Sequence, residues 1–393
     1  MSDPWLSMIG LTEDGLNGLS PASRAALDGA DIVFGGPRHL ELAAVGARGR
    51  PWPVPFSIAP VLALRGQRVA VLASGDPFWF GAGGVLAEAL AAGEWRCFPA
   101  PSVASLIAAE LGWRLEAVAC HGLHAAPFTR LLSDLRQGAR LIVLLRDGAA
   151  VADLAAWLVA RGWGASRLSV AERMGGPRQR IRQVRAGDYA FTDVAAPVAV
   201  AVEAAGGIAR PMGFGLPDDA FAHRGQITKR PVRALTLSAL APFAGGVLWD
   251  LGAGSGSVSI EWALAGGRAM AVETRDDRCD VVRANIDRFG LDGAVTLVQG
   301  DSRAVLAELP APDAVFIGGG ADAALVDAVR ARLSPGGRLV INAVTLETEA
   351  MLVAAQAAHG GDLMRIEVAQ AAPLGRMRGW SPLRPVVQWV WVA

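Results

Sequence analysis

The sequence contains little of what a metal site, a disulfide framework or a membrane span requires. Its 393 residues include three cysteines, Cys97, Cys120 and Cys279, which have neither zinc-site spacing nor a paired pattern. We therefore expect no metal and a reduced, cytoplasmic setting. The apolar stretch 194–202 is too short to cross a bilayer and ends at Glu203. The first ten residues have no basic segment and no long apolar run, so no signal peptide is expected.

The chain also lacks an excess of charge of either sign, because 37 basic and 37 acidic residues balance. A neutral chain has no general attraction to nucleic acid or to an anionic membrane, so neither is expected as a partner. Lysine is nearly absent, since Lys229 is the only basic residue that is not an arginine. A GC-rich genome explains the arginines, but the surviving lysine suggests a role that a guanidinium does not fill.

Strand-like and helix-like segments alternate regularly from residue 245 onward. Alternation of this length predicts right-handed crossovers and a parallel sheet covered on both faces. Two further strand-like runs, residues 362–370 and 384–392, are not separated from each other by a crossover helix and predict an antiparallel hairpin at the sheet edge. The expected fold of this part is α/β and Rossmann-like, with a mostly parallel seven-stranded sheet.

The first half of the chain alternates too, but its turns differ. Residues 69–84 predict a buried strand that runs into a Gly-Asp-Pro turn, and residues 139–149 predict a second buried strand. Residues 211–224 are rich in glycine and proline and have little periodicity, which predicts a linker. Because 393 residues are many for one core, we expect two domains, at residues 1–210 and 225–393.

The segment LWDLGAGSGSVSIEWAL, residues 248–264, predicts a strand, a glycine turn and the start of a helix. Its spacing, Gly252-x-Gly254-x-Gly256, places Ser257 where the dinucleotide fingerprint G-x-G-x-x-G has its third glycine. The pyrophosphate of NAD needs that close helix packing. The turn therefore favours a nucleotide cofactor other than NAD.

Acidic residues end three successive strands beside this turn, namely Asp250, Glu273 and Asp301. Asp250 suits an ammonium group, Glu273 can accept hydrogen bonds from both ribose hydroxyls, and Asp301 can meet the amino group of adenine. S-adenosylmethionine carries all three groups and no phosphate. The turn alone would also fit a structural α/β domain without a ligand.

These motifs give residues 225–393 a resemblance to the class I methyltransferase domain of cobalamin biosynthesis that acts on C15 of precorrin. The resemblance rests on residues 225–240 (GQITKRPVRALTLSAL), 248–263, 317–320 (IGGG) and 335–348 (PGGRLVINAVTLET). It implies that this domain methylates C15 and decarboxylates the C12 acetate.

The first half resembles the tetrapyrrole methylase family, in its C5-methylating precorrin branch. The matching segments are residues 9–27 (IGLTEDGLNGLSPASRAAL), 30–40 (ADIVFGGPRHL), 72–81 (LASGDPFWFG), 99–112 (PAPSVASLIAAELG) and 119–124 (ACHGLH). The resemblance implies a two-lobed domain that holds S-adenosylmethionine in a cleft between two small α/β lobes, largely through backbone groups.

Six residues map onto that implied cleft: Gly10, Gly75, Asp76, Pro77, Ser102 and Ser105. Thr12 departs from the family pattern, whose first strand usually ends Gly-x-Gly. Its side chain stands where bare backbone is expected.

Together the two resemblances imply one chain with two S-adenosylmethionine sites. The chain would methylate precorrin-6B at C5 in the first domain and at C15 in the second. It would also remove CO2 from the C12 acetate and give precorrin-8. A small-molecule tetrapyrrole is thus the expected partner, and a homo-oligomer is expected.

Candidate residues for the tetrapyrrole come from glycines and basic side chains. Gly318, Gly319 and Gly320 would let a broad flat ring approach the methyl donor, although a plain flexible turn is the alternative. The reacting meso carbons are enamine-like, so no strong base is expected.

Basic side chains are expected to bind the carboxylates of the substrate. Lys229 and Arg233 share a face of a predicted helix, and Arg378 lies in a predicted irregular loop. His121 is expected to border the first cleft or to pack in it.

Two other activities use similar folds. A tRNA methyltransferase would share the catalytic fold, but the neutral charge and the lack of a basic aromatic patch argue against RNA. An NAD-dependent oxidoreductase is disfavoured by Ser257 and Asp301. A non-catalytic scaffold would not need two intact ligand turns.

Overall fold

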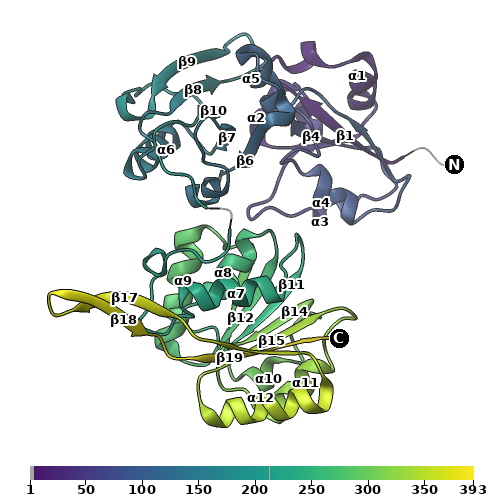
Figure 1. The fold of residues 1–393 in the computed structure, drawn as a ribbon. Helices are drawn as coiled ribbons and strands as arrows, with labels where there is room; N and C mark the ends of the chain where they lie inside the picture. Colours follow the sequence, from purple (N-terminus) through teal and green to yellow (C-terminus); the bar gives the residue numbers. More distant parts are fainter. Residues whose placement is uncertain (1–3, 212) are drawn as a thin grey trace. The chain divides into compact units, whose positions relative to one another are not determined.

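The structure is a computed structural model that describes residues 4–211 and 213–393. It divides into two compact units, Met1–Ala209 and Arg210–Ala393 (Figure 1). Residues 1–3 and Met212, which fall within the predicted first domain and the predicted linker, lie outside the described residues.

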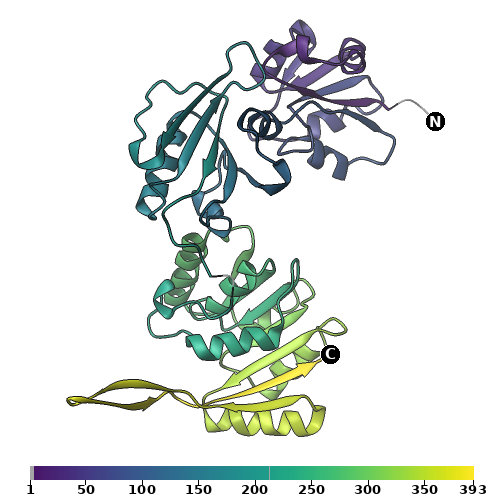
Figure 2. The same ribbon diagram turned by 45° about the horizontal axis from the view of Figure 1, so that its top comes forward.

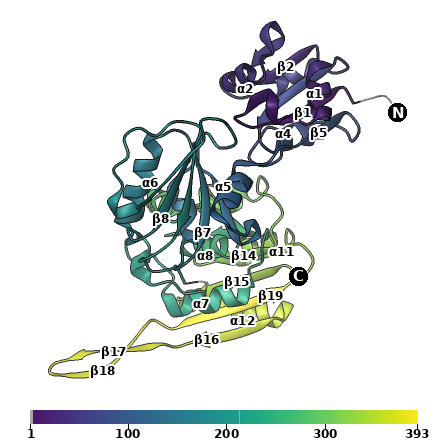
Figure 3. The ribbon, with the colours of Figure 1, turned by 90° about the horizontal axis from the view of Figure 1, so that it is seen from above.

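The first lobe of the first unit is built on a parallel five-stranded sheet with the order β3-β2-β4-β1-β5. Figure 3 shows this lobe from above, with β1, β2 and β5 labelled. Burial of β1 and β4 is almost continuous, as expected for parallel strands covered on both faces. The elements are β1 (Leu6–Leu11), α1 (Pro21–Asp28), β2 (Ile32–Gly35), α2 (Pro37–Leu42), β3 (Gly49–Pro51), α3 (Ala59–Leu62), β4 (Val69–Ser74), α4 (Gly83–Glu88) and β5 (Trp95–Phe98).

The second lobe is a mixed five-stranded sheet with the order β6-β7-β10-β8-β9, in which only β6 and β7 are parallel. Helix α5 packs Ala104 and Ile107 against this sheet. The elements are α5 (Val103–Leu111), β6 (Val118–Gly122), β7 (Arg140–Leu145), α6 (Ala149–Ala160), β8 (Arg167–Glu172), β9 (Arg180–Arg185) and β10 (Val198–Glu203).

The second unit contains the expected mostly parallel seven-stranded sheet, with the order β13-β12-β11-β14-β15-β19-β16. The first five strands are parallel, whereas β19 is antiparallel to both of its neighbours. The strands are β11 (Val247–Leu251), β12 (Arg268–Glu273), β13 (Val295–Gln299), β14 (Ala314–Ile317), β15 (Arg338–Ala343), β16 (Asp362–Ile366) and β19 (Val386–Val392).

Helices cover both faces of this sheet (Figure 1). One face carries α7 (Arg230–Leu240), α8 (Ser257–Leu264) and α9 (Asp276–Phe289), and the other carries α10 (Ser302–Val305), α11 (Ala323–Arg330) and α12 (Leu346–His359). Because successive side chains of a strand point to opposite faces, Leu248 joins the core under α8 and Trp249 joins the opposite core.

The C-terminal strands confirm the predicted antiparallel pairing at the sheet edge, since β16 pairs with β19. A separate two-stranded ribbon, β17 (Ala369–Leu374) and β18 (Met377–Pro382), lies between them in sequence and extends away from the sheet (Figure 2). Arg378 therefore lies in a strand, and the prediction that it lies in an irregular loop was wrong. Gly375, at φ +60°, provides the two-residue turn that pairs Leu374 with Met377.

The predicted linker is packed into the second unit. Leu216 and Phe221 are buried in the core beneath α7 and α8. The amides of Gly215 and Leu216 donate to the buried carboxylate of Glu261, at 2.6 and 3.0 Å. This glycine- and proline-rich segment is a fixed loop, because the Glu261 side chain of α8 accepts hydrogen bonds from two of its backbone amides.

No helix in residues 4–211 and 213–393 is long and apolar enough to cross a membrane. Cys97, Cys120 and Cys279 are free thiols.

Candidate active sites

The glycine turn of the second unit joins β11 to α8 and has a left-handed backbone at each glycine. The φ angles are +75° at Gly252, +61° at Gly254 and +70° at Gly256. A side chain at these positions would strain the backbone, because L-residues rarely adopt positive φ. The sequence therefore fixes an open loop of bare backbone at the carboxyl edge of the sheet, where parallel sheets bind ligands.

Glu273 connects this turn to the end of β12. Its side chain is 4% exposed. One carboxylate oxygen accepts from the Gly254 amide at 2.9 Å, and the other accepts from the amides of Thr274 and Arg275 at 2.9 and 3.1 Å. Three backbone donors thus hold the carboxylate in one orientation beside the turn. The oxygen that accepts from Gly254 keeps one acceptor site for a hydroxyl group, because a carboxylate oxygen can accept two hydrogen bonds.

Asp250, predicted to meet an ammonium group, is sealed inside the domain. Its Oδ2 accepts from the amide and the hydroxyl of Ser259, at 3.2 and 2.7 Å. Burial raises the pKa of Asp250 to about 6. The side chain ties β11 to the first turn of α8, and contact with an ammonium group would require this turn to open.

Asp301 follows β13, the strand beside β12, and is exposed. Its Oδ1 caps α10 by accepting from the amides of Arg303 and Ala304, at 3.0 and 3.4 Å. The structure thus places Asp250, Glu273 and Asp301 at the ends of three adjacent strands, as the sequence predicted.

The glycines Gly318, Gly319 and Gly320 follow β14 and adjoin the glycine turn. A Cβ placed on Gly252 would lie 3.5 Å from the carbonyl oxygen of Gly319. A Cβ on Gly319 would meet no atom within 4 Å, whereas Gly320 has φ +74°. Gly319 therefore borders open space without conformational need for glycine.

Sequence reasoning missed two apolar side chains at this edge. Val344 and Leu346 follow β15, which pairs with β14, and they are 47% and 79% exposed. Their signal was present in the segment NAVTLET, where apolar residues fill a strand-to-helix connection that is usually polar.

Arg233 was predicted to bind substrate, and the structure contradicts this prediction. Its guanidinium is completely buried and donates to Glu261 at 2.6 Å and to Asp218 at 3.0 Å. The face that Arg233 presents also contains Val232 and Leu237, so the helix turns it toward the core. The sequence showed that Lys229 and Arg233 share a face of this helix, but it did not show whether that face is exposed or buried.

Lys229 stands at the N-cap of α7 with its side chain 47% exposed, and its Nζ is 3.8 Å from Asp218. The segment it ends lies against the glycine turn, because a Cβ on Gly254 would be 3.3 Å from the carbonyl oxygen of Gln226. Lys229 is thus three residues away in sequence from Gln226, which contacts the glycine turn of the predicted cofactor site.

Arg378 is exposed on the ribbon that β16 and β19 carry. The ribbon leaves the sheet after Ile366, which pairs with Val386, and both pack against Val232 of α7. Its base is therefore at the sheet edge where β15 ends.

A second candidate site lies between the two lobes of the first unit, in a cavity of about 110 Å³. Leu11, Thr12 and Gly75 line it from the first lobe, and Leu144 and Ala199 line it from the second. Gly75 has φ +60°, and a Cβ on Gly10 would collide with its carbonyl oxygen. Bare backbone is thus required where β1 meets the Gly75 turn.

The remaining residues predicted for this cleft make local hydrogen bonds in the turns next to it. Ser102 caps α5 by accepting from the amide of Ser105 at 3.1 Å, and the two hydroxyls are 2.9 Å apart. Asp76 accepts from the amide of Phe78 at 2.9 Å, and the carbonyl of Pro77 accepts from the amide of Gly83 at 2.9 Å. Among the described lining residues, Gly75 is the only one of the six predicted.

His124 lines this cavity, whereas the sequence analysis predicted His121 for this place. His121 lies in β6 with its Nε2 3.1 Å from Asp134, and the pKa of that carboxyl is lowered by the contact. Burial lowers the pKa of His124. The two histidines differ in position, because His121 belongs to β6 and His124 lies in the loop that follows it.

The comparisons with known proteins agree with this division. Residues 6–190 match the family model of tetrapyrrole (corrin/porphyrin) methylases, and residues 219–393 match the precorrin methyltransferase domain. A Sinorhizobium protein named precorrin-6Y C(5,15)-methyltransferase (decarboxylating) is 45% identical, over 99% of this chain and 96% of that protein. The chain belongs to the precorrin-6Y C(5,15)-methyltransferase (decarboxylating) family.

Two further members illustrate the family. A Mycobacterium tuberculosis protein of the same name is 36% identical, over 97% of this chain and 98% of that protein. A crystal structure of the C-terminal domain of precorrin-6Y C5,15-methyltransferase from Rhodobacter capsulatus is also similar. The match has 56% sequence identity and a TM-score of 0.46, and it covers 47% of the present chain and 100% of the Rhodobacter chain.

Membership in a precorrin-6Y C(5,15)-methyltransferase family implies S-adenosylmethionine as the methyl donor. The residues present fit that cofactor, because an open glycine turn lies beside a fixed carboxylate, Glu273, that retains acceptor capacity. The family argues against the tRNA methyltransferase and the NAD-dependent oxidoreductase alternatives. In the described residues, no cluster of three histidine, cysteine or acidic side chains is placed to hold a metal ion.

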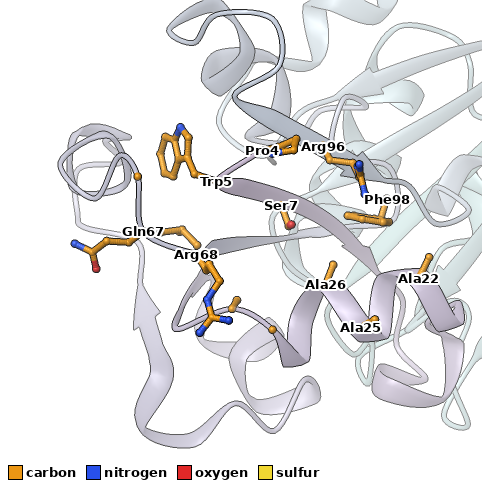
Figure 4. A pocket seen from close by; sticks show the side chains of 14 residues that line it. Pro4, Trp5, Ser7, Ala22, Ala25, Ala26, Gln67, Arg68, Arg96 and Phe98 are labelled. Atoms are coloured by element: carbon orange, nitrogen blue, oxygen red, sulfur yellow. The ribbon is translucent and has the colours of Figure 1, made fainter. Parts of the chain in front are cut away.

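The first lobe has another cavity, of about 520 Å³, whose lining side chains are drawn in Figure 4. Trp5, Ser7 and Val69 lie at its wall, at the amino ends of β1 and β4. Alanines of α1 form another part of the wall, and none of its described lining residues is acidic. It lies at the end of the parallel strands opposite to the one where such sheets bind ligands.

Proposed function

We propose that this chain uses two S-adenosylmethionine molecules, one in each unit, to methylate precorrin-6B at C5 and C15. In this proposal it also releases the C12 acetate carboxyl as CO2 and gives precorrin-8. The names of the full-length relatives support the two methylations and the decarboxylation. The two glycine-lined sites support one cofactor for each unit.

The second unit is assigned C15 methylation and decarboxylation. S-adenosylmethionine supplies an electrophilic methyl group when bound. The protein positions it, because the Gly254 amide and the carboxylate of Glu273 are already hydrogen-bonded to each other at 2.9 Å. A ribose hydroxyl would donate to the oxygen that accepts from Gly254 without a change of the carboxylate's rotamer, so positioning costs little entropy.

The tetrapyrrole is assigned to the open space beside Gly319. A Cβ at Gly319 would have no neighbouring atom within 4 Å. A flat ring can therefore approach the glycine turn from this side. Val344 and Leu346, exposed at the end of the adjacent strand, offer apolar surface to the ring. Lys229 is exposed near the same turn, and we assign it to a substrate carboxylate. Ring contact and carboxylate contact would together fix which meso carbon faces the methyl donor.

The first unit is assigned C5 methylation. Its cavity is lined by both lobes, so a cofactor bound there would contact both of them. Gly75 gives access to bare backbone donors and acceptors, and Thr12 lines the same wall with its hydroxyl turned to Asp14.

The observation that carries the proposal is the fixed Glu273 carboxylate beside the open glycine edge. The test is to incubate the full chain with precorrin-6B and methyl-labelled S-adenosylmethionine and to determine the mass of the product. We expect two labelled methyl groups and the loss of one CO2. A product with one methyl group, or with the carboxyl retained, would contradict the proposed pair of reactions.

A further inference from the structure

A polar cluster on the wall of the first-unit cavity has no role in the assignments above. It consists of Glu13, Arg38, His39 and Ser74. Arg38 and His39 lie in α2, directly after β2, while Glu13 follows β1 and Ser74 ends β4. The cluster is thus assembled at the carboxyl edge of the first-lobe sheet, and Glu13, Arg38 and Ser74 line the cavity.

Hydrogen bonds and one ion pair hold this cluster together. Arg38 forms an ion pair with Glu13 through Nη1, and its Nη2 donates to the Ser74 hydroxyl at 3.1 Å. The Nε2 of His39 lies 2.8 Å from the Ser74 hydroxyl and 2.9 Å from Arg38 Nη2. The guanidinium is therefore oriented by three neighbours, although its side chain is still 36% exposed.

Arg38 is the positive group of the cluster. Burial lowers the pKa of His39 to about 4, so its imidazole is neutral near pH 7. Among the described residues that line the cavity, Arg38 is the only arginine or lysine. An oriented, part-exposed guanidinium is suited to bind a carboxylate in two-point contact.

We propose that Arg38 binds a peripheral carboxylate of the tetrapyrrole in the first unit and that Glu13 occupies it between turnovers. This inference rests on the proposed C5 methylation in this unit. The carboxylate of the substrate and that of Glu13 would compete for one guanidinium. Glu13 is only 10% exposed, so it stays close to Arg38 when the substrate leaves.

Two substitutions with opposite expected effects test this competition in the full chain. Arg38→Gln should raise the KM for the tetrapyrrole in C5 methylation about tenfold, because a charge-assisted contact is lost. Glu13→Gln should lower that KM, because the competing carboxylate is removed. Arg38→Lys should fall between wild type and Arg38→Gln, since it keeps the charge and loses the fork. Arg68→Gln is the matched control, because Arg68 pairs with Asp31 at the other end of the same sheet.

The affinity for S-adenosylmethionine, measured by calorimetry, separates the possible failures. We expect it to be unchanged in all four variants. An equal rise of the tetrapyrrole KM in Arg38→Gln and Glu13→Gln would mean that the ion pair is merely structural and would overturn the inference. A loss of S-adenosylmethionine affinity in Arg38→Gln would overturn it too, by assigning Arg38 to the cofactor. Failure of the wild-type chain to methylate C5 would overturn the proposed function itself, and this inference with it.

Discussion

Glu273 is the side chain on which the proposed second-unit site depends most, because its carboxylate holds the glycine turn and is the group we propose to accept from the cofactor. Its three backbone donors are satisfied only while the carboxylate is present. Loss of the side chain therefore removes a ligand contact and leaves the amide of Gly254 without its partner. Both effects act on binding of the cofactor in the second unit.

We predict that Glu273→Ala weakens S-adenosylmethionine binding in the second unit by about 1.5–3 kcal/mol, the usual contribution of a charge-assisted hydrogen bond. Calorimetry on the full chain should show one weakened site and one unchanged site. Glu308→Ala, an exposed acidic residue of the same unit, is the control and should change neither. Unchanged affinity at both sites in Glu273→Ala would remove this residue from the cofactor site.

Asp250 gives a pH dependence whose sign follows from its burial. Its pKa is raised from 3.8 to about 6 in the folded chain, so the folded state binds the proton more tightly than the unfolded state. Its contribution to stability is therefore fully present below about pH 4 and is lost as the pH rises through 6. Above pH 6 the folded chain holds a buried carboxylate that two hydrogen bonds from Ser259 only partly compensate.

We predict that Asp250→Asn gains stability relative to wild type as the pH rises from 4 to 7. The expected change in the difference between the two free energies of unfolding is about 2–3 kcal/mol, from about 1.4 kcal/mol per pKa unit. Urea unfolding of both chains at several pH values measures it. A difference that does not vary with pH would show that Asp250 has an ordinary pKa.

At the scale of elements, the sequence predicted β11, the glycine turn and α8 well, because alternation and glycine spacing are local signals. It could not predict that residues 213–229 pack onto α8, because that packing depends on a distant partner. Glu261 lies 28 residues after Arg233, and neither residue type signals burial. The same reason explains His124, since a strand pattern does not show which side of a loop faces another lobe.

The segment 213–229 is held against α7 and α8 by the Arg233–Glu261 pair. Arg233 also donates to the carbonyl groups of Leu216 and Thr228, so one guanidinium joins both ends of this segment. Gln226 of this segment adjoins Gly254, so the pair also holds a neighbour of the glycine turn in place.

We predict that Arg233→Met destabilises the chain by about 3–5 kcal/mol, since it leaves Glu261 as an unpaired buried charge. Urea unfolding should show the loss. Arg230→Met, which changes an exposed neighbour in the same helix, should cost much less. A loss equal in both variants would assign the effect to the helix and would argue against the buried pair.

At the scale of the whole molecule, the chain is two compact units, and we propose a cofactor site in each. The sequence predicted this division from the length of the chain and from the glycine- and proline-rich segment 211–224. The ribbon of β17 and β18 could not be predicted, because its alternation is weak and its strands bury little surface.

We predict that the full chain binds two molecules of S-adenosylmethionine. Isothermal calorimetry should give a stoichiometry of two for wild type, and the Glu273→Ala variant should retain the site in the first unit. A stoichiometry of one for wild type would contradict the two-site account.

The division of labour between the units is the central claim, and Gly319→Val tests it most directly. The fold should tolerate valine there, because an added Cβ meets no atom within 4 Å and φ is not positive. Gly84→Val, which also adds a branched side chain into open space but in the first unit, is the matched control. Valine at 319 would hold the ring away from the methyl donor, and such displacements cost on the order of a hundredfold in rate.

The decisive measurement is the mass of the product that Gly319→Val makes from precorrin-6B and S-adenosylmethionine. We expect one added methyl group, at C5, and a retained carboxyl on the C12 acetate. A product with both methyl groups and the carboxyl lost, formed at the wild-type rate, would contradict it.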